Sequence, residues 1–214
     1  MNTVDKSIRN TISAHRIHNW LKDYPWLKGY IGDRSYPIWF VAENPSLRGV
    51  ERVHKRNRLI SENSQWNAHA GDRLFREALV KAGLKAGDPL DGEGWKCYIT
   101  DIIKEPEIVK DRNLRKRDSS YWKNQALNWL PVFLEEIRLG RPEVLVAVGS
   151  QTRPILEFLR NKGASLPRID QIQHYSYIMF RPDNWTGLGP GHSKRKRDFI
   201  ASVQRISKLY AQGP

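Results

Sequence analysis

Three short segments are almost continuously apolar, and they constrain the fold of this chain more than any other feature. They are YPIWFVA (residues 36–42), KCYITDII (96–103) and EVLVAVGS (143–150). Strands that are apolar on both sides are typical of a parallel sheet covered on both faces. A fourth segment, IDQIQH (169–174), has a weaker strand pattern. The sequence therefore predicts a central, mainly parallel sheet of four strands.

Helical patterns separate these strands. They predict helices over residues 72–82, 120–139 and 152–161, each closed by a glycine, and a last helix over about 197–210. Glycine is favoured there because the residue that closes a helix often takes a left-handed conformation. Strands that alternate with helices indicate an α/β fold, and a sheet covered on both faces makes it a three-layer α/β/α sandwich.

The composition gives no sign of a second domain. The 214 residues contain no internal repeat, low-complexity tract or obvious linker, and a chain of this length can bury one large core. We therefore expect a single domain over residues 1–214. Apolar residues at helical spacing between Ser7 and Lys28 predict that residues 1–35 form an N-terminal helical extension packed on this domain.

The single cysteine excludes several classes of site. Cys97 alone cannot form a disulfide framework, a zinc cluster or a four-cysteine iron–sulfur site within one chain. No apolar run approaches the roughly 20 residues of a membrane helix, and the N-terminus lacks the apolar core of a signal sequence. We expect a cytoplasmic monomer with no metal, no organic cofactor and no membrane partner.

The chain is strongly basic. Its formal charge is +13, from 36 Lys and Arg against 23 Asp and Glu, and much of the excess falls in residues 54–58, 112–117 and 192–197. Such a field attracts polyanions, nucleic acid above all. Basic clusters can also be solvated loops, so charge alone leaves both interpretations open.

Polar residues follow the predicted strands. Asn44, Asp101, Ser150 and His174 stand at four predicted carboxyl ends, which is where parallel α/β folds bind their ligands. We expect these residues to converge on one pocket. Each could instead be a turn or cap residue, and this alternative stays open for Ser150. The chain has no phosphate-binding loop, dinucleotide fingerprint or nucleophile elbow.

Taken in order, the strand ends and the segments after them resemble the uracil-DNA glycosylase superfamily. The resemblance covers about residues 36–180 and begins with FVAENPS (40–46), which is similar to the first motif of the family. The later motifs are similar to QWNAHAGDRLFREALVKAGL (65–84), YITDIIKEP (98–106), EEIRLGRPEVLVAVGSQT (135–152) and QHYSY (173–177). Their shared order and spacing carry the resemblance, because no single motif is decisive.

The resemblance implies an enzyme of base excision repair. Such an enzyme hydrolyses the N-glycosidic bond of uracil or another deaminated base in DNA and leaves an abasic site, after turning the nucleotide out of its stack. We expect a monofunctional glycosylase because no lysine is a candidate for a Schiff base in the pocket. The family 4 enzymes bind an iron–sulfur cluster through four cysteines, and with Cys97 alone no cluster is expected here.

Three residues are implied in catalysis. Asn44 stands directly before the proline of the first motif, where some members carry asparagine, and its amide would orient the attacking water. Glu43 matches the acid of the family 4 motif and would stabilise positive charge on the sugar or accept a proton from water. His174 would donate a hydrogen bond to the base oxygen that becomes anionic. His174 could instead cap a strand or contact a phosphate.

The base pocket would be formed by Ala42, Pro45, Trp66 and Asp101. Trp66 falls where the family places the aromatic that stacks on the flipped base, although a core tryptophan is the alternative. Asp101 replaces an asparagine that reads uracil, and a carboxylate would face the O4 atom with a second acceptor. Asp101 is therefore protonated by burial, or reads a base with a donor at that edge, or leaves the reading to backbone groups.

The segment after His174 would form the DNA-side loop. The resemblance implies a bulky residue that wedges into the vacated stack, and Tyr177, Ile178 and Met179 are the candidates. Phosphate contacts carry no sequence information but fix the register of the protein on DNA. The other residues expected to bind DNA are Ser150, Ser176, Arg181, Lys194, Arg195, Lys196 and Arg197.

Two other functions compete with the glycosylase. The first is a nucleic-acid-binding protein of the same fold with lost or altered catalysis, which Asp101 and Tyr175 favour because both depart from the family pattern. The second is a regulatory protein whose basic surface meets RNA or an acidic partner. Binding compared between RNA and single-stranded DNA at matched salt separates these two.

Overall fold

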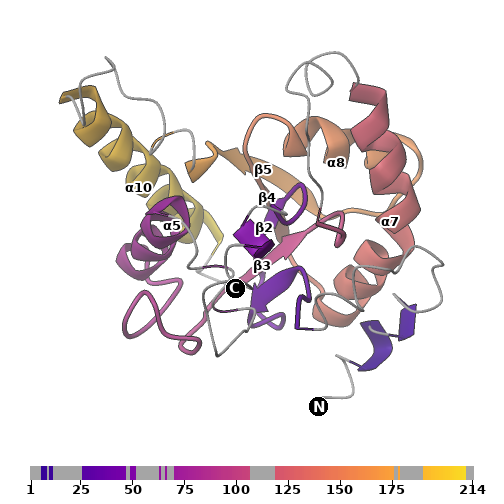
Figure 1. Cartoon of the computed structure of the whole chain (residues 1–214), viewed down its shortest axis with the longest axis horizontal. Helices are drawn as coiled ribbons and strands as arrows, with labels where there is room; N and C mark the ends of the chain where they lie inside the picture. Colours follow the sequence, from indigo (N-terminus) through magenta and orange to yellow (C-terminus); the bar gives the residue numbers. More distant parts are fainter. Residues whose placement is uncertain are drawn as a thin grey trace.

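A mixed sheet of five strands forms the centre of the chain (Figure 1). The computed structural model describes residues 6–8, 10–11, 26–46, 49–51, 63, 66, 70–106, 119–175, 178 and 190–210. The strand order is β1-β3-β2-β4-β5, and all neighbours are parallel except β1 and β3. The strands are β1 (Tyr30–Gly32), β2 (Ile38–Ala42), β3 (Tyr98–Asp101), β4 (Val144–Val148) and β5 (Arg168–Ile172).

The predicted count of four strands was wrong because it omitted β1. This strand lies within the segment predicted as a helical extension, and it pairs antiparallel with β3 at the edge of the sheet. Gly32 has φ +99°, and a Cβ atom there would lie 2.4 Å from the Cys97 carbonyl oxygen, so only glycine fits. Helical residues do occur near the N-terminus, at 6–8 and 10–11, but the chain is no longer helical at Trp26–Lys28.

In the described part of the chain, helices cover both faces of the sheet (Figure 1). The side chains of Trp39 and Val41 belong to the core under α7 (Ser119–Gly140) and α8 (Thr152–Asn161), while Phe40 belongs to the core under α5 and α10. All five residues of β2 are buried, as expected for a strand with helices on both sides. The α/β class and the layered arrangement predicted from the apolar runs are confirmed.

The last helix starts earlier than predicted. Helix α10 spans Pro190–Tyr210 rather than beginning near residue 197, and it packs beside α5 (Ala70–Lys81), where Ser207 Oγ donates to the Ala82 carbonyl oxygen at 2.7 Å. Proline is compatible with the first helical turn because its missing N–H would have no partner there. No helix in the described part of the chain is long and apolar enough to cross a membrane.

The topology creates a switch point between two central strands. Helix α5, which comes between β2 and β3 in the chain, lies on one face of the sheet, whereas α8, which comes between β4 and β5, lies on the opposite face. Loops that diverge in this way open a crevice at the carboxyl edge of a parallel sheet, and ligands bind there. The switch point therefore marks the carboxyl ends of β2 and β4 as the place to look for a site.

Candidate active site at the carboxyl edge of the sheet

Backbone hydrogen bonds hold the ends of β2 and β3 together at this edge. Ala42 and Asp101 are register partners, and beyond them the Ile102 N–H donates to the Ala42 carbonyl at 3.0 Å. The Ile103 N–H donates to the Glu43 carbonyl, also at 3.0 Å. These bonds place Glu43 and Asp101 on neighbouring chain segments.

Glu43 and Asn44 follow β2 directly and are half-buried. The Asn44 side-chain amide donates a long hydrogen bond of 3.4 Å to the carbonyl oxygen of Pro45, which is itself buried. Proline fixes one backbone angle and disfavours helix in the residue before it, and Asn44 lies in neither a helix nor a strand. The acid and the amide thus stand at the switch point before the chain turns toward α5.

His174 reaches the same edge by packing against the end of β4. The Gly149 N–H donates to the Ile172 carbonyl at 2.9 Å, and Gly149 has φ +101°. A Cβ atom at Gly149 would lie 3.2 Å from the Cβ of His174 and 3.3 Å from its Cδ2. The absence of a side chain at Gly149 therefore lets the half-buried imidazole approach the switch point closely.

Stacking on Tyr175, which in turn stacks on Phe75, fixes the orientation of His174. Its ring stacks on that of Tyr175 with centroids 4.5 Å apart and an angle of 28°, and Tyr175 stacks on Phe75 at 5.2 Å and 13°. The Tyr175 hydroxyl donates a hydrogen bond to Asp72 of α5. Burial, followed by the charges of Asp72 and Asp101, raises the pKa of Tyr175 well above its usual value. The hydroxyl therefore stays protonated and holds this stack to α5.

Asp101 is a buried acid at this edge. Its exposed fraction is 2%, and it is close enough to Tyr175 for its charge to act on that hydroxyl. Asp101 and Asp72 thus approach one hydroxyl from β3 and α5. Asp72 was not predicted, and its position in the first turn of a helix indicated only an ordinary acid at a positive helix end.

The start of α8 lies at the same edge. Ser150 is exposed, and the helix begins after Gln151 without a side-chain cap and without an acid in its first turn. The Thr152 hydroxyl instead donates to the Val148 carbonyl at 3.0 Å. The first N–H groups of a helix attract anions, so this end of α8 is suited to a phosphate in combination with other basic groups.

Two predicted contact residues are buried and require correction. Ile178 has an exposed fraction of 0% and belongs to the core between α5 and α10, so it cannot act as a wedge in this conformation. Trp66 is 5% exposed and belongs to the same core, which favours the core alternative over a stacking surface. Burial of this kind depends on tertiary packing that a local pattern does not reveal.

The basic residues near position 195 belong to a helix rather than to the predicted loop. Lys194 and Arg197 are exposed in the first turns of α10, and Arg195 and Lys196 are half-buried. Lys196 Nζ forms an ion pair with Glu77 Oε2 at 2.9 Å. The other residues expected to contact DNA, Ser176, Tyr177, Met179 and Arg181, lie outside the described residues.

The described residues contain no set of side chains suited to binding a metal ion. No group of three or more His, Cys, Asp or Glu side chains there is placed to hold a metal ion. Cys97 is a free, fully buried thiol, and burial raises its pKa above the ordinary range, so the group stays protonated as a core residue.

Comparison with known proteins assigns no family. No protein-family model matches the chain, and no curated protein matches it. The candidate site therefore rests on its own geometry: Glu43, Asn44, Asp101 and His174 stand at the carboxyl edge of a mainly parallel sheet, around its switch point.

Proposed function

We propose that this protein is a monofunctional DNA glycosylase that removes uracil or another deaminated base from DNA. The observation that carries the proposal is the placement of Glu43, Asn44 and His174 around the switch point of the sheet. These are the residues to which the resemblance with the uracil-DNA glycosylase superfamily gives catalytic roles. An acid, an amide and an imidazole at one edge match what hydrolysis of an N-glycosidic bond requires.

The reaction divides among these three groups. The Asn44 amide orients a water molecule toward the anomeric carbon, and the Glu43 carboxylate stabilises the positive charge that develops on the sugar. The water oxygen bonds to the carbon while the bond to the base nitrogen breaks, the electron pair leaves with the base, and the water gives up a proton to the Glu43 carboxylate. His174 donates a hydrogen bond to the base oxygen that becomes anionic, an interaction worth about 2.7 to 4 kcal/mol for a well-placed donor.

The basic surface supports DNA as the substrate. Lys194 and Arg197 are exposed at the start of α10, and the uncapped start of α8 adds N–H donors at the site. The chain carries a net charge of +13. Phosphate contacts of this kind release counterions, so affinity for DNA is expected to fall steeply as salt rises.

A second candidate is a nucleic-acid-binding protein that does not release bases. The burial of Trp66 at 5% exposure favours it, because a stacking residue needs an open face. Asp101 favours it too, since an ionised carboxylate would repel the O4 atom of uracil. Under this reading the protein retains DNA binding and the residues at the carboxyl edge recognise an unpaired nucleotide.

Base release decides between the two candidates. Purified protein is incubated with single- and double-stranded DNA carrying one uracil, hypoxanthine or xanthine, and abasic sites are then cleaved with alkali. We expect strand cleavage on at least one substrate, and its loss in Asn44→Ala and His174→Ala. Binding without cleavage on every substrate would establish the second candidate.

A neighbouring exposed residue supplies the control. Gln173→Ala changes the residue directly before His174, and Gln173 is exposed with no assigned role. This variant should cleave as well as the unmodified protein. A loss in Gln173→Ala equal to that in His174→Ala would show that the segment, rather than the imidazole, matters.

A further inference from the structure

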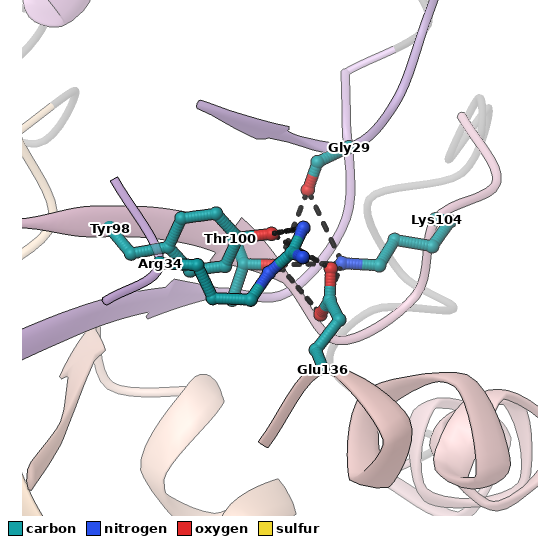
Figure 2. Close-up of polar contacts among 6 residues, drawn as sticks. All are labelled: Gly29, Arg34, Tyr98, Thr100, Lys104 and Glu136. Atoms are coloured by element: carbon teal, nitrogen blue, oxygen red, sulfur yellow. Dashed lines mark hydrogen bonds and ion pairs between the residues drawn. The ribbon is translucent and has the colours of Figure 1, made fainter. Parts of the chain in front are cut away.

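A buried ion pair joins α7 to the segment that follows β3. Lys104 Nζ lies 2.8 Å from Glu136 Oε2, and both side chains have an exposed fraction of 0%. The Thr100 hydroxyl accepts a hydrogen bond from Lys104 at 2.5 Å and donates one to Glu136 at 3.0 Å. Figure 2 shows these side chains converging beneath the carbonyl group of Gly29.

The second oxygen of Glu136 extends this network. Tyr98 donates its hydroxyl proton to Glu136 Oε1 at 3.1 Å, and Arg34 donates to the Tyr98 oxygen at 3.1 Å (Figure 2). Burial, followed by the charge of Glu136, raises the pKa of Tyr98 well above its usual value. The phenol therefore remains a donor, and both carboxylate oxygens of Glu136 are held.

Stability alone does not account for such a pair. Two charges moved out of water lose hydration, and their attraction often only offsets that loss, so a well-packed apolar pair of similar volume is commonly as stable. Ion pairs of this type can instead select one arrangement of the chain. The position of Lys104 in the chain therefore indicates which arrangement the ion pair selects.

Lys104 holds the exit of β3 at the candidate site. It comes three residues after Asp101, and the two residues between them donate their N–H groups to the carbonyls of Ala42 and Glu43. The Gly29 carbonyl accepts from the Asp101 N–H at 2.9 Å and from Lys104 Nζ at 3.4 Å. One network thus holds Asp101 from the β1 side and Glu43 from the β2 side.

Gly29 is shaped for this contact. It has φ +70°, and a Cβ atom there would lie 2.8 Å from Cδ of Lys104. The carbonyl can approach the buried ammonium group because no side chain intervenes. Gly29 before β1, helix α7 and the segment after β3 therefore pack against one another.

We infer that Lys104 and Glu136 are positioning residues of the candidate active site, which fix Glu43 and Asp101 by tying the exit of β3 to α7. This assignment rests on the proposed function. Neither residue touches the substrate, and each acts through the backbone of residues 101–104. Misplacement of reacting groups by about 1 Å can lower a rate about 100-fold, so a loosened exit should reduce turnover far more than binding.

The test replaces both charges with apolar groups. Lys104→Met/Glu136→Leu removes the ion pair without leaving a lone buried charge, so the double variant is expected to fold. In the full-length protein we expect kcat for base release to fall about 10- to 100-fold with KM within about twofold. Amide exchange followed by NMR should become faster at Ile102 and Ile103, because their bonds to Ala42 and Glu43 are no longer held.

Lys85→Met is the matched control. Lys85 is another buried lysine, 2% exposed, but it lies in the turn between α5 and β3, at the opposite edge of the sheet. Its replacement should lower stability while kcat and exchange at Ile102 and Ile103 stay unchanged. A fall in kcat equal to that of the double variant would overturn the inference, because any loss of stability would then suffice.

The remaining outcomes are also decisive. Unchanged kcat in the double variant overturns the inference, whether or not exchange becomes faster. If the unmodified protein releases no base from any substrate, the proposed function fails, and the positioning of the β3 exit is then judged by exchange alone. Faster exchange at Ile102 and Ile103 in the double variant but not in Lys85→Met supports it, and unchanged exchange overturns it.

Discussion

Two buried clusters of charge lie at opposite edges of the sheet, and they satisfy their cations differently. At the carboxyl edge Lys104 is paired with the carboxylate of Glu136. At the amino edge Lys85 donates to the carbonyls of Ala86 and Glu93, and Arg76 donates to the carbonyls of Pro89 and Asp91. The first cluster connects three elements of secondary structure, whereas the second closes the connection between α5 and β3 and also holds Asn63, whose Oδ1 accepts from Arg76 at 2.8 Å.

The amino-edge cluster also uses an aromatic ring. The Arg76 guanidinium carbon lies 4.8 Å and Lys85 Nζ 4.9 Å from the centre of the Trp95 ring. Burial, which outweighs nearby aspartates, lowers the pKa of Arg76 to about 10. Carbonyls and a ring can solvate a cation without fixing the position of any distant element. The difference teaches that burial of a charged residue does not by itself indicate a function. The elements of secondary structure that the residue links together are more informative.

The comparison predicts its largest effect on stability for replacement of Lys104. Lys104→Met alone leaves Glu136 buried without its cation and should lower the free energy of unfolding by about 3 to 5 kcal/mol. Lys104→Met/Glu136→Leu should recover most of that loss. Urea unfolding of both variants measures the two values, and a single variant as stable as the double would show that water reaches Glu136.

The second-largest loss of stability is expected in the amino-edge cluster. Lys85→Met should lower the free energy of unfolding by about 1.5 to 3 kcal/mol, because two loop carbonyls lose a charged donor. Among the described residues no buried acid is paired with Lys85, so the loss should be smaller than for Lys104→Met. Equal losses in the same urea experiment would break the distinction between the clusters.

A third substitution tests the carboxyl edge without changing any charge. Gly149→Ala places a Cβ atom 3.2 Å from that of His174 at φ +101°, and the left-handed conformation costs about 1 to 2 kcal/mol for a residue with a side chain. Base release should fall by more than this loss of stability explains, because the imidazole is displaced. Gly163→Ala, also at positive φ (+93°) but with no atom within 4 Å of the added Cβ, is the control.

The smallest effect concerns an exposed pair. Burial acts to raise the pKa of Asp170, but hydrogen bonds from Arg205 and from the backbone of Gln171 outweigh it, and the pKa lies below the ordinary 3.8. A depressed pKa in the folded state gives stability that is present above 3.8 and lost as pH falls through the lower value.

Arg205→Gln should therefore reduce the loss of stability between about pH 6 and about pH 3. The expected change is below about 1 kcal/mol because the Arg205 side chain is 47% exposed. Urea unfolding at the two pH values measures it. A change as large as that of Lys85→Met would mean that exposed and buried pairs contribute alike here.

The central strands were predictable because helices cover both of their faces, which leaves a continuous apolar run. Strand β1 was not predictable, since a strand of three residues that ends in a glycine is too short for any period to emerge. The start of α10 was missed because Pro190 and Gly191 resemble a loop, although proline suits a first helical turn.

The site was predictable only in part, for a related reason. Strand ends are local features, so the positions of Asn44, Asp101 and His174 at one edge follow from the pattern of strands. The hydrogen bond between Tyr175 and Asp72 joins the segment after β5 to α5 and has no local signal in the sequence. The burial of Trp66 and Ile178 likewise depends on how α5 and α10 meet over the sheet.

Strand β1 has a consequence for how copies of this protein meet one another. It occupies the open side of β3 with only three residues, and the chain then turns away at Asp33. At the other end of the sheet, β5 has five residues and carries the charged side chains of Arg168 and Asp170. Short or charged outer strands are poor templates for strand addition from a second molecule. The same small strand, which follows Gly29 and contributes Gly32 to the packing of β3, therefore also protects the sheet from aggregation.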